Sequence, residues 1–144
     1  MELQKIHSFT IDHSVHGPDF YLSSEKNGIF TYDLRFKWPN KGDYLDVAAM
    51  HTIEHLFATV IRNSPIKEQV VYFGPMGCCT GFYLLLQGIT KDQAKEATIK
   101  AFKDCLKIDE VPGAGENECG NYKLHNLPLA KKEIEAYLEV LKSK

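Results

Sequence analysis

The amino-acid sequence predicts an α+β fold in which helices pack on a largely antiparallel sheet. Residues 30–36 alternate apolar and polar side chains, residues 82–87 form an apolar run, and three other stretches repeat apolar residues at helical spacing. The chain has 144 residues, which is long enough for one hydrophobic core and too short for two independent ones. We therefore expect a single domain spanning residues 1–144.

The first predicted element is a strand at residues 30–36, where a period of two separates an apolar face from a polar face. The apolar face consists of Phe30, Tyr32, Leu34 and Phe36. Arg35 belongs to the other face and therefore points away from the core or into a site. A turn through residues 39–42 ends the strand, and Asp43 or Asp46 can cap the helix that follows.

That helix is expected at residues 47–62, because apolar side chains recur there at helical spacing. Its apolar stripe consists of Met50, Ile53, Phe57 and Val60, flanked by Leu56 and Ile61. Two further strands are expected at residues 69–73 and 82–87, and a glycine-rich turn at residues 74–81 joins them.

A capping-box pattern then starts a second helix at residue 91, in which Cys105 occupies a position expected in the core. Residues 111–127 contain a proline and three closely spaced glycines, so we expect a long loop. A closing amphipathic helix follows, with Asn126 and Pro128 as its start signals.

Composition excludes several classes of function. The 17 basic and 19 acidic side chains leave a net charge of −2, and no basic stripe provides a nucleic-acid-binding surface. No apolar run is long enough to span a bilayer, and the amino terminus has no secretion signal, so we expect a cytoplasmic protein without a membrane partner. In that reducing compartment the four cysteines are expected as free thiols or metal ligands.

The spacing of His51 and His55 is the main indication of chemistry. Residues four apart share one face of a helix, so one metal ion could bind both imidazoles, and Glu54 lies beside that face. Cys119 on the long loop is the candidate third ligand, because two imidazoles and a thiolate suit zinc or ferrous iron. Three ligands leave a fourth position open, as in catalytic sites, whereas closure by a cysteine of the glycine-rich turn would make the site structural. The alternative is that these histidines are ordinary residues of an amphipathic helix.

Five motifs occur in order along the chain: Ser8-Phe9 with Asp12-His13, Asp33-Leu34-Arg35-Phe36 with Pro39-Asn40, His51-Thr52-Ile53-Glu54-His55, Gly77-Cys78-Cys79-Thr80-Gly81-Phe82-Tyr83, and Cys119-Gly120. Their order and context resemble those of the S-ribosylhomocysteine lyases, the LuxS family, over nearly the whole chain. The resemblance implies a homodimer whose sites lie near the subunit interface, with both chains contributing to each site.

The site residues that the resemblance implies fall into three groups. The metal ligands are His51, His55 and Cys119. The acid and base groups are Glu54 and Cys78. The substrate-binding residues are Ser8, His13 and Arg35. The resemblance also implies one divalent metal ion per subunit, Fe(II) or Zn(II).

The reaction implied by the resemblance cleaves S-ribosylhomocysteine to homocysteine and 4,5-dihydroxy-2,3-pentanedione, the precursor of autoinducer-2. A metal on the sugar carbonyl acidifies the neighbouring carbon, so that Cys78 can move protons between adjacent carbons while Glu54 moves them among the oxygens. Once the carbonyl reaches the third carbon, β-elimination releases the homocysteine thiolate.

Two positions depart from the family pattern. Cys79 stands where glutamine or arginine is usual, and Tyr72-Phe73-Gly74 replaces a more polar Asp-Ile-Ser run, which leaves open how the substrate is contacted there. Two other functions fit part of the sequence. One is a non-catalytic metal-binding module with four protein ligands, and the other is an inverted-motif zinc peptidase, which would require a downstream glutamate ligand and a larger chain.

Overall fold

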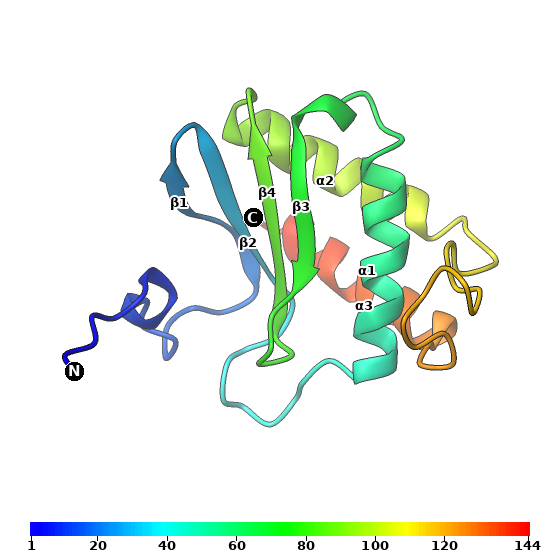
Figure 1. The fold of residues 1–144 in the computed structure, drawn as a ribbon, viewed down its shortest axis with the longest axis horizontal. Helices are drawn as coiled ribbons and strands as arrows, with labels where there is room; N and C mark the ends of the chain where they lie inside the picture. The colour runs from blue at the N-terminus through cyan, green and yellow to red at the C-terminus, as the bar shows by residue number, and fades with distance from the viewer.

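A computed structural model describes residues 1–144 and contains a four-stranded antiparallel sheet against which three helices pack. The strands, in the spatial order β1-β2-β4-β3, are β1 (Asp19–Lys26), β2 (Ile29–Arg35), β3 (Val70–Pro75) and β4 (Gly81–Gln87). The helices are α1 (Val47–Ile61), α2 (Lys91–Cys105) and α3 (Leu127–Lys142). Figure 1 shows α2 and α3 behind the sheet and α1 beside β3. The α+β prediction is confirmed. None of the helices combines the length and the apolar character that a membrane-spanning helix needs.

The register of β2 against its neighbours decides which side chains face the helices. Leu34 lies opposite Phe20 of β1 and Phe82 of β4, and all three side chains are buried in the core. Because successive side chains of a strand point to opposite faces, Asp33 and Arg35 lie on the face away from the helices. Both are nevertheless buried, with 1% and 2% of their surface exposed.

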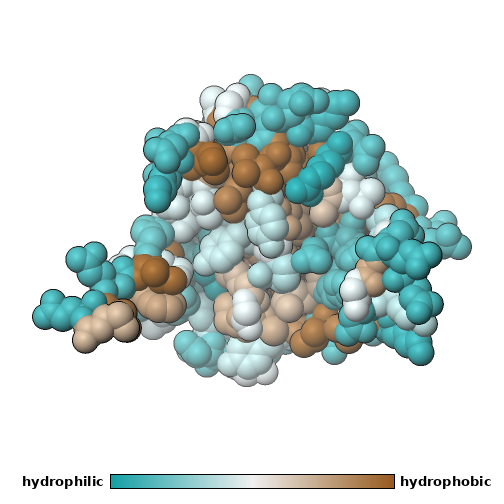
Figure 2. Space-filling view, viewed as in Figure 1, coloured by the Kyte–Doolittle hydropathy of each residue, from teal (hydrophilic) through white to brown (hydrophobic).

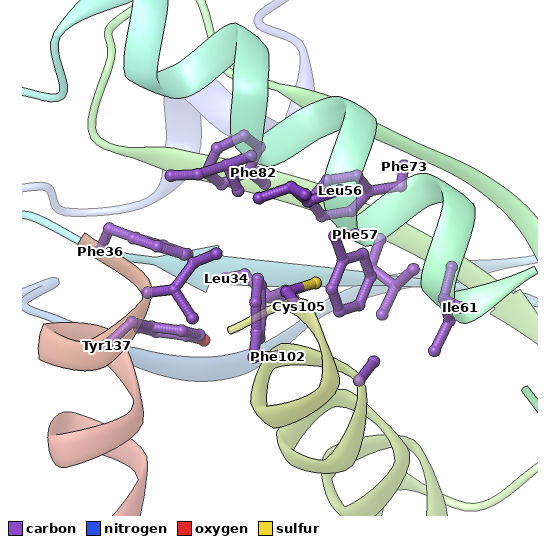
Figure 3. Packing of buried hydrophobic residues seen from close by; sticks show 14 of the residues in the cluster. Leu34, Phe36, Leu56, Phe57, Ile61, Phe73, Phe82, Phe102, Cys105 and Tyr137 are labelled. Atoms are coloured by element: carbon purple, nitrogen blue, oxygen red, sulfur yellow. The ribbon is translucent and has the colours of Figure 1, made fainter. Parts of the chain in front are cut away.

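Aromatic rings occupy the centre of the core between the sheet and the helices (Figure 3). The Phe102 ring of α2 lies 4.4 Å from that of Phe57 on α1, 5.7 Å from that of Phe36, and 5.6 Å from that of Tyr137 on α3, measured between centroids. Phe102 therefore joins all three helices to the end of β2, and its side chain is fully buried.

The three helices begin where the sequence predicts. The Asp46 side chain accepts a hydrogen bond from the backbone of Ala49 at the start of α1, α2 opens with the expected capping box, and Asn126 caps α3. One detail differs: Leu56 and Ile61, predicted at the flanks of the apolar stripe, are fully buried. The buried surface of α1 is wider than one stripe because this helix packs against α2, α3 and β3 together.

Strand β1 was not predicted from the sequence. Its register shifts between Leu22 and Ser24, so the side chains do not alternate regularly along the strand. Polar residues also occupy much of it, which leaves only weak local evidence for a strand.

Truncation of the central ring tests this description of the core. We expect Phe102→Ala to lower the free energy of unfolding by about 3–5 kcal/mol, because it removes buried surface and leaves a cavity between three helices. Urea denaturation measures the change. Glu96→Ala, at an exposed position of the same helix, is the control, and a similar loss in both variants would contradict the assignment.

The buried thiol of Cys105 gives a second test. Burial raises its pKa to about 12, so almost no thiolate, the reactive form, exists at pH 8. We expect iodoacetamide to leave Cys105 unmodified in the folded protein and to modify it in urea, as mass spectrometry of peptides would show. The exposed Cys78 is the internal control, and equal labelling of the two thiols in the folded state would contradict this prediction.

Candidate functional site

Two groups of chemically active side chains lie on different elements of the fold. The histidine cluster consists of His51, His55, Cys119 and His125. The thiol cluster consists of Cys78, Thr80, Arg35 and Asp33. The first lies between α1 and the segment that precedes α3, and the second lies where β2 ends and β4 begins.

Backbone carbonyl groups fix the orientation of the two α1 histidines. Figure 1 shows the segment between α2 and α3 on the side of α1 away from the sheet. From this segment, the Leu124 carbonyl oxygen lies 2.7 Å from His51 Nδ1, and the Pro112 carbonyl oxygen lies 2.8 Å from His55 Nδ1. A carbonyl can only accept a hydrogen bond, so each Nδ1 carries a hydrogen and each neutral ring directs the lone pair of Nε2 into the cluster.

The spacing of the three predicted ligand atoms fits a tetrahedral metal ion. His51 Nε2 lies 3.2 Å from His55 Nε2, and Cys119 Sγ lies 3.5 and 3.7 Å from these two nitrogens. Ordinary zinc bond lengths place tetrahedral ligand atoms about 3.3 Å apart for two nitrogens and about 3.6 Å apart for nitrogen and sulfur. Two nitrogen lone pairs that face each other at 3.2 Å also repel unless a cation lies between them. The donor set therefore suits a divalent metal ion.

His125 is a fourth member of the cluster that the sequence analysis missed. Its Nε2 lies 3.8 Å from Cys119 Sγ, and its ring stacks on that of His51 at a centroid distance of 4.1 Å. Burial lowers its pKa and thereby favours the neutral ring. The only sequence signal was its position six residues after Cys119, immediately before the cap of α3.

Glu54 borders an open cavity next to the histidine cluster. The cavity has a volume of about 380 Å³, and Glu54, His55 and Tyr72 contribute to its walls. The ring of Tyr72 lies over Gly74, where a larger residue would collide with it unless the ring moved. The Tyr72 ring therefore fills the space that a side chain at position 74 would take.

In the thiol cluster, Arg35 connects a buried carboxylate to Cys78. Its Nε and Nη2 donate to the two carboxylate oxygens of Asp33 at 3.1 and 2.6 Å, and its Nη1 donates to Thr80 Oγ1 at 2.7 Å. The same Nη1 lies 4.0 Å from Cys78 Sγ, which is 3.0 Å from Thr80 Oγ1. His16 Nε2 lies 2.8 Å from Asp33 Oδ2, the oxygen that also accepts from Arg35 Nη2. The guanidinium is thus held rigidly with one edge toward the exposed thiol.

The amino-terminal segment places the remaining predicted site residues next to neighbours of the thiol cluster. The His13 ring lies 6.4 Å from that of His16, between centroids, and its Nδ1 donates to the Ile11 carbonyl oxygen at 2.8 Å. Burial raises the pKa of Tyr83, and the Asp33 carboxylate raises it further, whereas Arg35 and the Ser8 hydroxyl act in the opposite direction. Arg35 therefore lies beside Cys78, Ser8 lies next to Tyr83, and His13 lies near His16, which contacts Asp33 of the thiol cluster.

Cys79 contributes to the turn between β3 and β4 and to the packing of the core. Its backbone adopts φ 61°, and its carbonyl oxygen accepts a hydrogen bond from the Leu45 amide at 2.8 Å. The half-buried side chain packs against the core, and neither cluster includes its sulfur. No hydrogen bond or ion pair joins the histidine cluster to the thiol cluster.

Comparison with known proteins gives one consistent result. The family model described as S-Ribosylhomocysteinase (LuxS) matches residues 6–144. The chain is 45% identical over 146 residues to the S-ribosylhomocysteine lyase of Borreliella burgdorferi, in an alignment that covers 96% of this chain and 93% of that protein. Identity to the proteins of the same name from Phocaeicola vulgatus and Porphyromonas gingivalis is 46% and 42%, with 96% of this chain and 91% and 92% of theirs covered. The chain belongs to the S-ribosylhomocysteinase (LuxS) family.

Proposed function

We propose that residues 1–144 form a single metal-dependent lyase domain that cleaves S-ribosylhomocysteine in the cytoplasm. The products are homocysteine and 4,5-dihydroxy-2,3-pentanedione, the precursor of autoinducer-2. The observation that carries the proposal is the convergence of two imidazole nitrogens and one thiol sulfur at tetrahedral spacing, in a chain of this family. A cavity bordered by Glu54 opens beside them.

His51, His55 and Cys119 are the residues that hold the metal ion, one Fe(II) or Zn(II) per subunit. Both metals accept imidazole and thiolate ligands, so this donor set suits either. When bound, the ion supplies Lewis acidity that draws electrons from the sugar carbonyl and makes the hydrogen on the neighbouring carbon acidic.

Cys78 is the base that moves protons between carbons. The Arg35 guanidinium, with Nη1 4.0 Å from Cys78 Sγ, and the Thr80 hydroxyl at 3.0 Å orient the sulfur toward the substrate. The thiolate removes a proton from the carbon next to the carbonyl and returns it to the adjacent carbon. Glu54 moves the accompanying proton between the two oxygens, so the carbonyl migrates from the first carbon to the second and then to the third.

Elimination completes the reaction without a change of overall oxidation state. With the carbonyl at the third carbon, loss of a proton from the fourth carbon forms a carbon–carbon double bond and breaks the bond from the fifth carbon to sulfur. The electron pair of that bond leaves with sulfur as the homocysteine thiolate. Tautomerisation of the resulting enol gives the diketone.

Ser8, His13 and Arg35 bind the substrate beside Cys78. His13 donates through Nδ1 to its own segment, which leaves Nε2 as an acceptor for a sugar hydroxyl. The carboxylate of Asp33 occupies the edge of the Arg35 guanidinium formed by Nε and Nη2, so the substrate is contacted by Nη1, which faces Cys78.

A homodimer is required to assemble the complete site. Within one chain the thiol cluster lies on the sheet face away from the helices, while the histidine cluster lies on the outer side of α1 (Figure 1). Figure 2 shows apolar residues gathered over the strands on the sheet face turned to the viewer. Exposed apolar side chains of the strands include Leu22, Val71 and Tyr72. A second copy that covers this face would bring its own metal ligands to Cys78.

Substitutions test the assigned roles. We expect Cys78→Ala and Glu54→Gln to reduce turnover by about 10²-fold or more, because each removes a proton-transfer group. Cys79→Ala should keep most of the activity, since the sulfur of Cys79 belongs to neither cluster. Release of free thiol from S-ribosylhomocysteine by the metal-loaded protein measures the rate. Equal losses in the two cysteine variants would refute the distinction between Cys78 and Cys79.

Mixing two inactive variants tests the shared site. If Cys78 and Glu54 of one site come from different chains, a heterodimer of Cys78→Ala and Glu54→Gln subunits contains one intact site and one doubly altered site. Random exchange of subunits should then restore about a quarter of the wild-type turnover per site. If each chain supplies both groups, every site remains defective and the mixture stays inactive. The control is Cys79→Ala mixed with Cys78→Ala, which tests whether subunit exchange alone alters the rate.

A further inference from the structure

The structure assigns to His125 a role different from that of the other two histidines in the cluster. We propose that Thr52 fixes His125 in the tautomer with the hydrogen on Nε2, so that His125 donates a hydrogen bond to Cys119 Sγ and does not bind the metal ion. The inference rests on the proposed metal site and specifies how its fourth position is kept free of protein.

The Thr52 hydroxyl has two hydrogen-bonding neighbours outside its own helix. The side chain of Thr52 is fully buried on α1, and its Oγ1 accepts a hydrogen bond from the Asn126 amide at 3.0 Å. The other neighbour of Oγ1 is His125 Nδ1, at 2.9 Å. The hydroxyl hydrogen must therefore go to His125 Nδ1, because otherwise it would be buried without an acceptor.

Thr98 shows what a buried helical threonine does without such a neighbour. It is also fully buried, but its hydroxyl donates to the Ala94 carbonyl oxygen one turn earlier in α2, at 2.8 Å. Thr52 makes no corresponding bond to its own helix. Its hydroxyl is directed out of α1 toward His125.

The tautomer of His125 follows from this bond. A neutral imidazole has one hydrogen, so a ring that accepts at Nδ1 carries its hydrogen on Nε2. A protonated Nε2 has no lone pair for a metal ion, but it can donate to Cys119 Sγ, 3.8 Å away. His51 and His55 have the opposite tautomer, since backbone carbonyls require a hydrogen on their Nδ1 atoms.

The tautomer of His125 decides whether a cluster of three histidines and one cysteine offers a metal ion four ligands or three. Four protein ligands would close the coordination shell and make the site structural, whereas three leave a position for substrate. A hydrogen bond from His125 withdraws electron density from the Cys119 thiolate, which makes the thiolate a weaker donor and leaves a bound ion more electrophilic. His125 is thus a positioning residue that acts through Cys119.

Nitrogen NMR of the zinc-loaded protein, with ¹⁵N-labelled histidine, reads each tautomer directly. We expect His51 and His55 to show a protonated Nδ1 and an Nε2 shifted by metal, and His125 to show a protonated Nε2 and an unprotonated Nδ1. The His125→Gln variant assigns the signals. A metal-shifted Nε2 or a protonated Nδ1 on His125 would overturn the proposal. Absence of metal shifts on His51 and His55 would instead refute the proposed metal site, so the two failures are distinguishable.

A matched pair of threonine variants tests the cause of the tautomer. Thr52→Val removes the hydroxyl that donates to His125 Nδ1, so the protonated Nε2 form should lose its dominance in the same spectrum. Thr98→Val removes an equally buried hydroxyl at a distance from the cluster and should leave the His125 signals unchanged. Unchanged His125 signals in Thr52→Val would overturn the assignment to Thr52.

The absorption spectrum of the cobalt-substituted protein tests the hydrogen bond from His125 to Cys119 Sγ. Glutamine at position 125 can still donate near the Nε2 position, whereas methionine, of similar size, cannot. We expect His125→Met to shift the thiolate-to-cobalt charge-transfer band to longer wavelength, and His125→Gln to shift it much less. Identical bands in both variants and the wild type would overturn the role of His125 as a donor to Cys119.

Discussion

The contacts between the backbone of residues 111–126 and the two α1 histidines are the constraint on which the site depends. A helix alone brings His51 and His55 to one face, but it leaves each ring free to rotate and to present either nitrogen. The carbonyls of Pro112 and Leu124 remove that freedom, and the same segment carries Cys119. A long loop without regular structure therefore orients the rings of the two proposed metal ligands.

The two faces of the sheet have different roles. One face supplies the core for three helices, and the other holds a buried ion pair beneath the amino-terminal segment. Desolvation of Asp33 and Arg35 carries a cost, which their paired hydrogen bonds and the contact with His16 offset. In return, the guanidinium beside Cys78 cannot swing away into solvent. The contacts that hold the proposed base and those that hold the proposed metal ligands thus come from different parts of the chain.

Local patterns predicted most of the fold and part of the site. Apolar periodicity, caps and turn signals located α1, α2, α3, β2, β3 and β4, because these signals depend only on neighbours in sequence. Strand β1 was missed because a register shift interrupts its alternation. His125 and Thr52 were missed for another reason: their contact joins residues 73 positions apart, and neither belongs to a spacing pattern that indicates metal binding. The partners of His51 and His55 are main-chain atoms, which no residue type encodes.

The contact between Tyr72 and Gly74 makes the residue at one position depend on the side chain at the other. Any side chain at position 74 would occupy the space of the Tyr72 ring, so the exposed ring must turn aside before position 74 can carry a larger residue. Because Tyr72 forms part of the wall of the cavity beside Glu54, a larger residue at position 74 would also reshape that cavity.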